Sequence, residues 1–249
     1  MNTVWLYALI SVALVSLISL IGLSLLSLAV DKLRRLLFLL VSLSAGVLMG
    51  DAFIHLLPEL VADYGFDLSV SLSVLSGITV FFIVEKIVHW RHCHHQANGV
   101  HAHPFVVTNL VGDTVHNMVD GLVIGASYLV SVPVGVATTI AVALHEIPQE
   151  VSDFGVLIHG GFSKQKALWV NFLVALSSIV GVVAALLLGQ YVGDITGFLL
   201  AFSAGAFIYI AAADLIPELH KEVRVSRSLG QLSLFILGIF VMMALLWLK

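Results

Sequence analysis

Apolar residues run through this sequence in eight long stretches, which are separated by short segments marked by charged residues, Gly and Pro. A helix needs about 20 apolar residues to cross a bilayer. The stretches cover residues 3–29, 34–60, 68–91, 105–130, 133–158, 165–190, 193–219 and 229–248. They leave no room for a soluble domain. We therefore expect an all-α integral membrane protein with eight transmembrane helices, forming a single domain over residues 1–249.

Composition excludes a soluble fold. Asp, Glu, Lys and Arg make up only 10% of the chain, where a soluble domain has about 25%. The formal net charge of −4 gives no indication of a nucleic-acid partner, and the expected surroundings are a lipid bilayer. The single cysteine, Cys93, excludes an internal disulfide and a four-cysteine zinc site. The sequence leaves a homodimer open.

Basic residues set the expected orientation. Ten of the eleven fall in alternate loops, at Lys32, Arg34, Arg35, Lys86, Arg91, Lys164, Lys166, Lys221, Arg224 and Arg227. Loops rich in Lys and Arg are cytoplasmic in membrane proteins. With eight crossings, both termini then lie outside. We expect the membrane to be a cell membrane (inner or plasma).

One segment of the sequence recurs. Residues 44–60 (SAGVLMGDAFIHLLPEL) align without gaps on residues 203–219 (SAGAFIYIAAADLIPEL), 159 positions later, with eight identities in seventeen. The two copies fall on the second and seventh helices, which cross in opposite directions. This predicts an inverted repeat of helices 1–3 and 6–8 around helices 4 and 5, a plan common in secondary transporters.

Ionisable residues gather at mid-depth on the fourth and fifth helices, where charge is costly and marks a functional path by default. On the fourth helix, residues 113, 116, 117 and 120 are Asp, His, Asn and Asp, a spacing that lines one helix face. The fifth has His145, Glu146, Gln149, Glu150 and Asp153 on one face. Imidazole with carboxylate suits zinc, iron(II), cobalt and manganese, whereas a soft copper(I) site would need thiolates. The alternatives are a polar network that joins helices and a proton relay without metal.

Two motifs resemble a known family. HNMVDG (116–121) and HEIPQE (145–150) resemble the paired signatures of the ZIP (Zrt/Irt-like) metal-ion transporters. The match is closest to the branch with an HExPHE-type motif in its fifth helix, and the related stretches of helices two and seven also resemble that branch. The resemblance implies movement of a divalent metal ion into the cytoplasm, with zinc as the main substrate and iron(II), manganese and cadmium as competitors.

The resemblance also implies the metal positions. His116, Asp120, His145 and Gln149 correspond to one position. Asn117, Asp120 and Glu146 correspond to an adjacent position, so that Asp120 bridges the two. Gln149 departs from the branch, which usually has His there; its amide is either a harder, weaker zinc ligand or points at a neighbouring helix and ligates nothing.

Other polar residues extend the expected path. Asp51 and His55 lie on the outer half of the second helix and are candidates for the entrance. Glu150, also a candidate metal ligand, lies with Asp113 and Asp153 on the cytoplasmic side and suggests an exit. Asp214 and Glu218 would form the inner mouth. Asn171 either adds a metal ligand or forms a hydrogen bond between helices, which is the commoner role.

The loop over residues 90–104 is rich in histidine, and we expect it to be cytoplasmic and to collect or sense metal, or else to be a solvated linker. The chain is not expected to be an enzyme. The fifth helix reads HEIPQ, so the second histidine of an HExxH zinc protease is missing. An intramembrane zinc metalloprotease and a metal-gated membrane sensor remain the alternatives.

Overall fold

The computed structural model describes residues 2–21, 30–93, 103–192 and 195–248, and within these ranges the chain is helical in eight runs. The runs are α1 (Asn2–Ser16) with a 3₁₀ turn (Leu17–Leu20); α3 (Val30–Gly50), η2 (Asp51–Leu56) and α4 (Leu57–Tyr64); α5 (Leu68–Cys93); α6 (His103–Val130); α7 (Val132–His159); α8 (Lys164–Ala175) and α9 (Ser177–Tyr191); α10 (Ile195–Tyr209), η3 (Ile210–Leu215) and α11 (Ile216–Leu219); and α12 (Val225–Leu245) with a 3₁₀ turn (Leu246–Leu248). The all-α prediction is confirmed.

Six of these runs are long and apolar enough to cross a membrane: Thr3–Leu20, Leu36–Tyr64, Leu68–Lys86, Lys164–Tyr191, Ile195–Leu219 and Val225–Leu245. Their outer faces expose large apolar side chains such as Leu14, Trp169 and Phe240, which a soluble protein would not leave in water. The chain is therefore an integral membrane protein. The two remaining runs, α6 and α7, carry the polar stripes.

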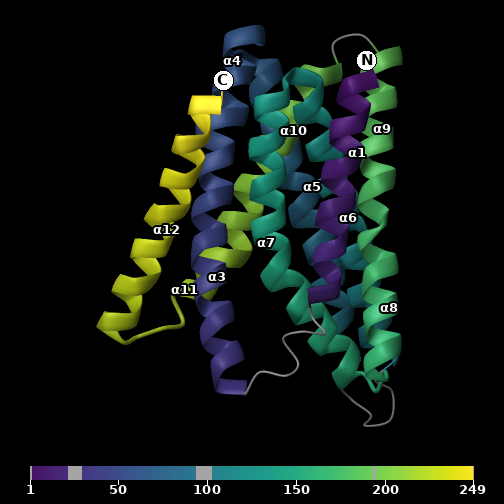
Figure 1. Cartoon of the computed structure of the whole chain (residues 1–249), viewed down its shortest axis with the longest axis vertical. Coiled ribbons are helices and arrows are strands. Elements are labelled where there is room, and N and C mark those ends of the chain that lie inside the picture. The colour runs from purple at the N-terminus through teal and green to yellow at the C-terminus, as the bar shows by residue number, and fades with distance from the viewer. Residues whose placement is uncertain (1, 22–29, 94–102, 193–194, 249) are drawn as a thin grey trace.

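The helices form one bundle, and the chain begins and ends at the same end of it (Figure 1). Helix α6 packs on α7 and α9, α3 packs on α12, and α5 packs on α10. Glycine allows the α6–α9 contact to be close, because a Cβ at Gly121 would lie 1.8 Å from the carbonyl oxygen of Ser178, and one at Gly181 would lie 1.9 Å from that of Met118. In lipid there is no hydrophobic driving force between helices, so they associate largely through close van der Waals packing. Small residues at the contact make this packing possible.

Two of the helical runs contain a π-helical segment, η2 and η3, and each segment is followed by a proline, Pro58 or Pro217. Proline has no N–H and clashes with the carbonyl one turn before it. A π turn adjusts the hydrogen bonding around such a position. Thus the N–H of Leu57 donates to the carbonyl of Ala52, five residues back, and that of Ile216 donates to Ala211.

Candidate metal site

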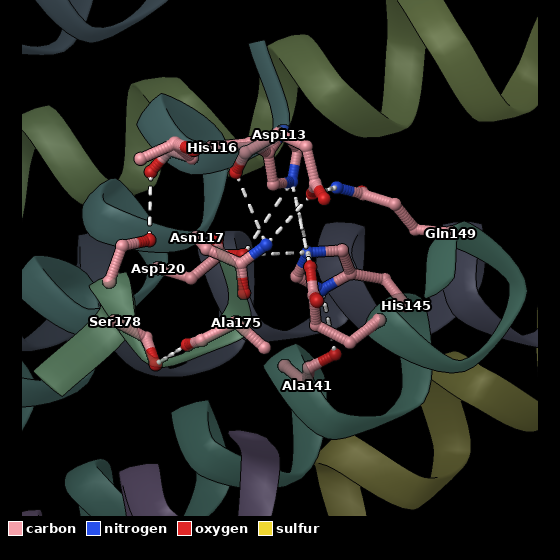
Figure 2. A network of polar contacts seen from close by, with 12 residues as sticks. Asp113, His116, Asn117, Asp120, Ala141, His145, Gln149, Ala175 and Ser178 are labelled. Carbon is pink, nitrogen blue, oxygen red and sulfur yellow. Dashed lines mark hydrogen bonds and ion pairs between the residues drawn. The ribbon is translucent and has the colours of Figure 1, made fainter. Parts of the chain in front are cut away.

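Helices α6 and α7 bring four side chains together in the middle of the bundle (Figure 2). His116 and Asp120 lie one turn apart on α6, and His145 and Glu146 are neighbours on α7. One ligand atom from each of the four lies within 4.8 Å of the others. Asp120, His145 and Glu146 are at most 2% exposed. We call these four residues the central cluster.

The spacing of the central cluster is that of a metal cage. The Nε2 of His145 lies 3.4 Å from Nε2 of His116, 3.4 Å from Oδ2 of Asp120 and 3.5 Å from Oε1 of Glu146. From His116 Nε2, the same two carboxylate oxygens are 3.6 and 3.9 Å away. Tetrahedral zinc with bonds of about 2.0–2.1 Å would separate its ligand atoms by about 3.3–3.4 Å. Five of the six separations among the four atoms are therefore near those that one zinc ion requires, and the sixth, between the two carboxylate oxygens, is at most 4.8 Å.

The cluster's atoms are also free to bind. The carbonyl of Ala141 lies 3.2 Å from Nδ1 of His145, and because a carbonyl can only accept, Nδ1 carries the proton and Nε2 presents its lone pair to the cluster. Both carboxylate oxygens of Asp120, and Oε1 of Glu146, are buried without a hydrogen-bond donor in the described part of the chain. Buried oxygens of this kind call for a cation.

The two amides expected at the metal face Asp113 instead. The side-chain nitrogen of Asn117 donates to Oδ1 of Asp113 at 2.8 Å and to its backbone carbonyl at 3.2 Å, and that of Gln149 donates to the same Oδ1 at 3.3 Å (Figure 2). Both amides therefore orient the carboxylate of Asp113. This arrangement differs from the assignment of Gln149 to the first metal position that the resemblance implies.

Glu150 and Asn171 form a separate contact. The amide nitrogen of Asn171 donates to the carboxylate of Glu150 and, at 3.3 Å, to its backbone carbonyl, and both side chains are buried. This contact ties α8 to α7. Of the two roles that the sequence left open for Asn171, the geometry favours the helix–helix bond.

The residues expected at the entrance are enclosed. Asp51 is 0% and His55 is 1% exposed. Oδ2 of Asp51 accepts from the hydroxyl of Thr138 at 2.9 Å, and Nε2 of His55 donates to the carbonyl of Met242 at 2.9 Å. In this conformation neither residue lies at an open mouth.

A cleft reaches the central cluster from the other end. It has a volume of about 440 Å³ and is lined by residues of α5, α7 and η3–α11 together with His116 and His145. Asp214 and Glu218, expected at the inner mouth, line it as well. The structure is therefore open towards the side that carries these two carboxylates.

Three polar residues that the sequence analysis did not select take part in this arrangement. Thr138 holds Asp51, Ser44 donates to the carbonyl of Leu144, and Asn109 donates to Asp153 at 2.9 Å. Asn109 could have been found from its spacing, because it extends the polar face of α6 by one turn. Most of the histidine-rich tract, residues 94–102, lies outside the described residues.

Comparison with known proteins decides the family. The family described as ZIP zinc transporter matches residues 2–108 and 92–246. The chain belongs to this family. It is 32% identical to the zinc transporter zipt-7.1 of Caenorhabditis briggsae over 82% of this chain and 69% of the relative. It is also 34% identical to the zinc transporter ZIP13 of Pongo abelii (82% and 65%) and 31% identical to human zinc transporter SLC39A7 (86% and 64%).

Membership of the ZIP family confirms the resemblance that the motifs of α6 and α7 indicated. ZIP proteins are transporters, so the protease alternative is set aside. The chain spans between 64 and 69% of the length of these three relatives.

Proposed function

We propose that this chain moves zinc across a membrane towards the cytoplasm and binds the ion in transit at the central cluster. The observation that carries the proposal is the set of five distances of 3.4–3.9 Å among two imidazole nitrogens and two carboxylate oxygens. Zinc accepts this ligand set in tetrahedral geometry. Iron(II), manganese and cadmium are the expected competitors, because imidazole and carboxylate do not exclude them.

A second ion adjacent to the first, bridged by Asp120, belongs to the same proposal. Oδ2 of Asp120 faces the two histidines of the central cluster, and Oδ1 is buried without a donor in the ranges described. Asn117 would have to turn its amide away from Asp113 to join that position. Zinc binding by purified protein whose five histidines of residues 92–103 are replaced by Ser tests this: Asn117→Ala should bind one zinc ion fewer than the protein that keeps Asn117.

All eight helical runs cross the membrane in this proposal, with the termini opposite the cytoplasm and the membrane itself a cell (inner or plasma) membrane. Helices α6 and α7 have 28 residues each, about 42 Å at 1.5 Å per residue, which exceeds a hydrocarbon core of about 30 Å. Their polar stripes face the bundle interior, as intramembrane charges do. The basic loops support the orientation.

An inverted repeat is part of the proposal, and the placement of the π-helical segments supports it. Residue 51 begins η2 and residue 210 begins η3, so the two segments differ by 159 positions, the same offset as the sequence repeat. Close contacts follow the same offset. A Cβ at Gly46 would lie 2.0 Å from the carbonyl of Phe235 on α12, and one at Gly205, 159 positions later, would lie 2.0 Å from that of Val74 on α5.

Zinc uptake into proteoliposomes tests the proposed function. The wild type should accumulate zinc, with iron(II), manganese and cadmium competing. Asp120→Ala should abolish uptake, because it removes one carboxylate of the cage and leaves the neighbouring groups uncompensated. Asp67→Ala is the control, since Asp67 is exposed and contacts the backbone at the start of α5. Equal uptake by Asp120→Ala and the wild type would contradict the central site, and absence of flux in the wild type would favour a sensor.

A further inference from the structure

A cavity of about 170 Å³ lies between α5, α6, α7 and the α10–η3 segment. His116 of the central cluster lines one part of it. Four carboxylate side chains line it as well: Glu85, Asp113, Asp153 and Asp214. Three of these also line the larger cleft that reaches Glu218, namely Glu85, Asp153 and Asp214. The cavity and the cleft therefore adjoin each other, and both reach His116 of the central cluster.

Amide groups hold two of these carboxylates, each through one oxygen. Oδ1 of Asp113 accepts from Asn117 at 2.8 Å and from Gln149 at 3.3 Å. Oδ1 of Asp153 accepts from Asn109 at 2.9 Å. An amide NH₂ can only donate, so these three residues fix the orientation of the carboxylates. Outer partners of this kind are what position metal-binding carboxylates.

The second oxygen of each carboxylate has a different environment. Oδ2 of Asp113 and Oδ2 of Asp153 are both buried, and neither accepts a hydrogen bond from the residues that the structure describes. The Asp113 residue is only 6% exposed. A buried carboxylate oxygen without a donor is costly unless a cation compensates it. The two residues that carry these oxygens line one cavity, and a cation bound there would compensate both.

We propose that Asp113 and Asp153 form a further cation site, separate from the position bridged by Asp120 and made only of oxygen ligands, through which the transported ion passes between the central cluster and the inner mouth. This proposal rests on the proposed function. The cavity has room for roughly five water molecules at about 30 Å³ each. The site therefore takes a partly hydrated divalent cation, with two carboxylates and water as ligands.

The ligand chemistry gives this inner site a purpose. Carboxylate and water favour manganese and magnesium over the softer ions that imidazole prefers. Zinc that leaves the two histidines of the central cluster therefore reaches a site that holds it less tightly. Because His116 lines the same cavity as Asp113 and Asp153, the ion can move from the central cluster to the inner site without passing a long apolar stretch. Asn109 and Gln149 act as positioning residues that keep the carboxylates turned towards the ion.

Manganese binding, measured by electron paramagnetic resonance on the full chain in detergent, tests the inner site. The five histidines of residues 92–103 are replaced by Ser so that the tract binds no metal. His145→Ala together with Asp120→Ala disables the central cluster and the adjacent position bridged by Asp120. This protein should still bind one Mn²⁺. Adding Asp153→Asn or Asp113→Asn should weaken that binding by at least about tenfold, because a charged ligand is lost.

Asp51→Asn is the matched control. Asp51 is also buried, also has one oxygen held by a hydrogen bond, from Thr138, and also has a second oxygen without a donor among the described residues. It lines neither the cavity nor the cleft. Its substitution should leave Mn²⁺ binding unchanged. An equal loss in Asp51→Asn and Asp153→Asn would overturn the proposal.

Two further readouts separate the proposals. Retained Mn²⁺ binding in Asp153→Asn overturns the inner site even if Asp113→Asn fails to fold, because Asp153 is more exposed and tests the site by itself. In the protein with an intact central cluster, Asp153→Asn should slow zinc uptake severalfold while zinc affinity at the central cluster stays the same. Failure of the central site would instead be seen as normal zinc uptake by Asp120→Ala, whatever the Mn²⁺ result.

Discussion

The hydroxyl of Ser44 on α3 lies 2.7 Å from the carbonyl oxygen of Leu144 on α7 and 2.8 Å from that of Leu40 on its own helix, so its single proton is shared between these two acceptors. Pro148, four residues after Leu144, has no N–H to offer that carbonyl. A carbonyl freed in this way could bind a metal ion or mark a hinge. The structure instead has it satisfied by a neighbouring helix, next to His145 of the central cluster.

Removing this hydroxyl should destabilise the protein. Ser44→Ala would leave the part-buried Leu144 carbonyl without this donor, which costs about 1–3 kcal/mol. Ser42→Ala is the matched control, because the hydroxyl of Ser42 donates to the carbonyl of Phe38 within the same helix. The Phe38 carbonyl keeps its backbone hydrogen bond in this variant. Thermal unfolding in detergent measures both. Equal stability of the two variants would contradict a specific role for Ser44.

Position 149 should influence metal preference. Gln149 lines the cleft together with His116 and His145, so Gln149→His places an imidazole nitrogen beside the central cluster. Nitrogen favours zinc over manganese, and we expect the ratio of zinc to manganese uptake to rise. Turnover should fall if zinc is released more slowly.

Ser152→His is the control for position 149. Ser152 lines the same cleft one turn further along α7, so an imidazole there stands farther from the central cluster. It should change the zinc-to-manganese ratio less than Gln149→His does. An unchanged ratio in Gln149→His would remove position 149 from the ligand set.

Cysteine labelling should determine the orientation. Cys93 is the only native cysteine and is first replaced by Ser. Ser131 and Ser163 each cap a helix start, with hydrogen bonds from the backbone N–H of Val134 and Lys166. Single cysteines at these two positions therefore disturb similar local structure. A membrane-impermeant reagent should label Ser131→Cys from outside and Ser163→Cys from the cytoplasm. Labelling of both from one side would contradict the orientation.

The histidine-rich tract should be dispensable for flux. Replacing the five histidines of residues 92–103 with Ser should leave most zinc uptake, because the four residues of the central cluster all lie on α6 and α7. The comparison is uptake by this variant against the wild type and Asp120→Ala in the same proteoliposomes. A loss as complete as that of Asp120→Ala would assign the tract to the path itself.

The close contact between α6 and α9 should make Gly121 intolerant of a side chain. The added Cβ of Gly121→Ala would meet the carbonyl of Ser178, and overpacking of this kind costs about 1–3 kcal/mol. Gly155→Ala on α7 meets nothing within 4 Å and should stabilise its helix by about 0.5–1 kcal/mol. Unfolding measurements on the pair check both signs. Stabilisation by Gly121→Ala would show that the helices lie farther apart.

Much of the fold could be predicted because the bilayer restricts the choices. Backbone polar groups in lipid must be satisfied within the segment, so a long apolar stretch has to become a helix. The polar faces of α6 and α7 could also be predicted, because residues such as Asp113, His116 and Asp120 repeat at helical spacing. The π-helical segments were not predicted, because one extra residue in a turn does not change the pattern of a helix that is apolar on nearly every side.

The sequence by itself determined the helices, their polar faces and the ZIP family, because each depends on residues close together in the chain. Only the tertiary structure decided which polar atoms meet. His116, Asp120, His145 and Glu146 converge, whereas Asn117 and Gln149 turn to Asp113, and the carbonyl freed by Pro148 is taken by Ser44. An amide or a carbonyl takes the partner that the packed neighbouring helix offers, and spacing along one helix contains no information about that neighbour.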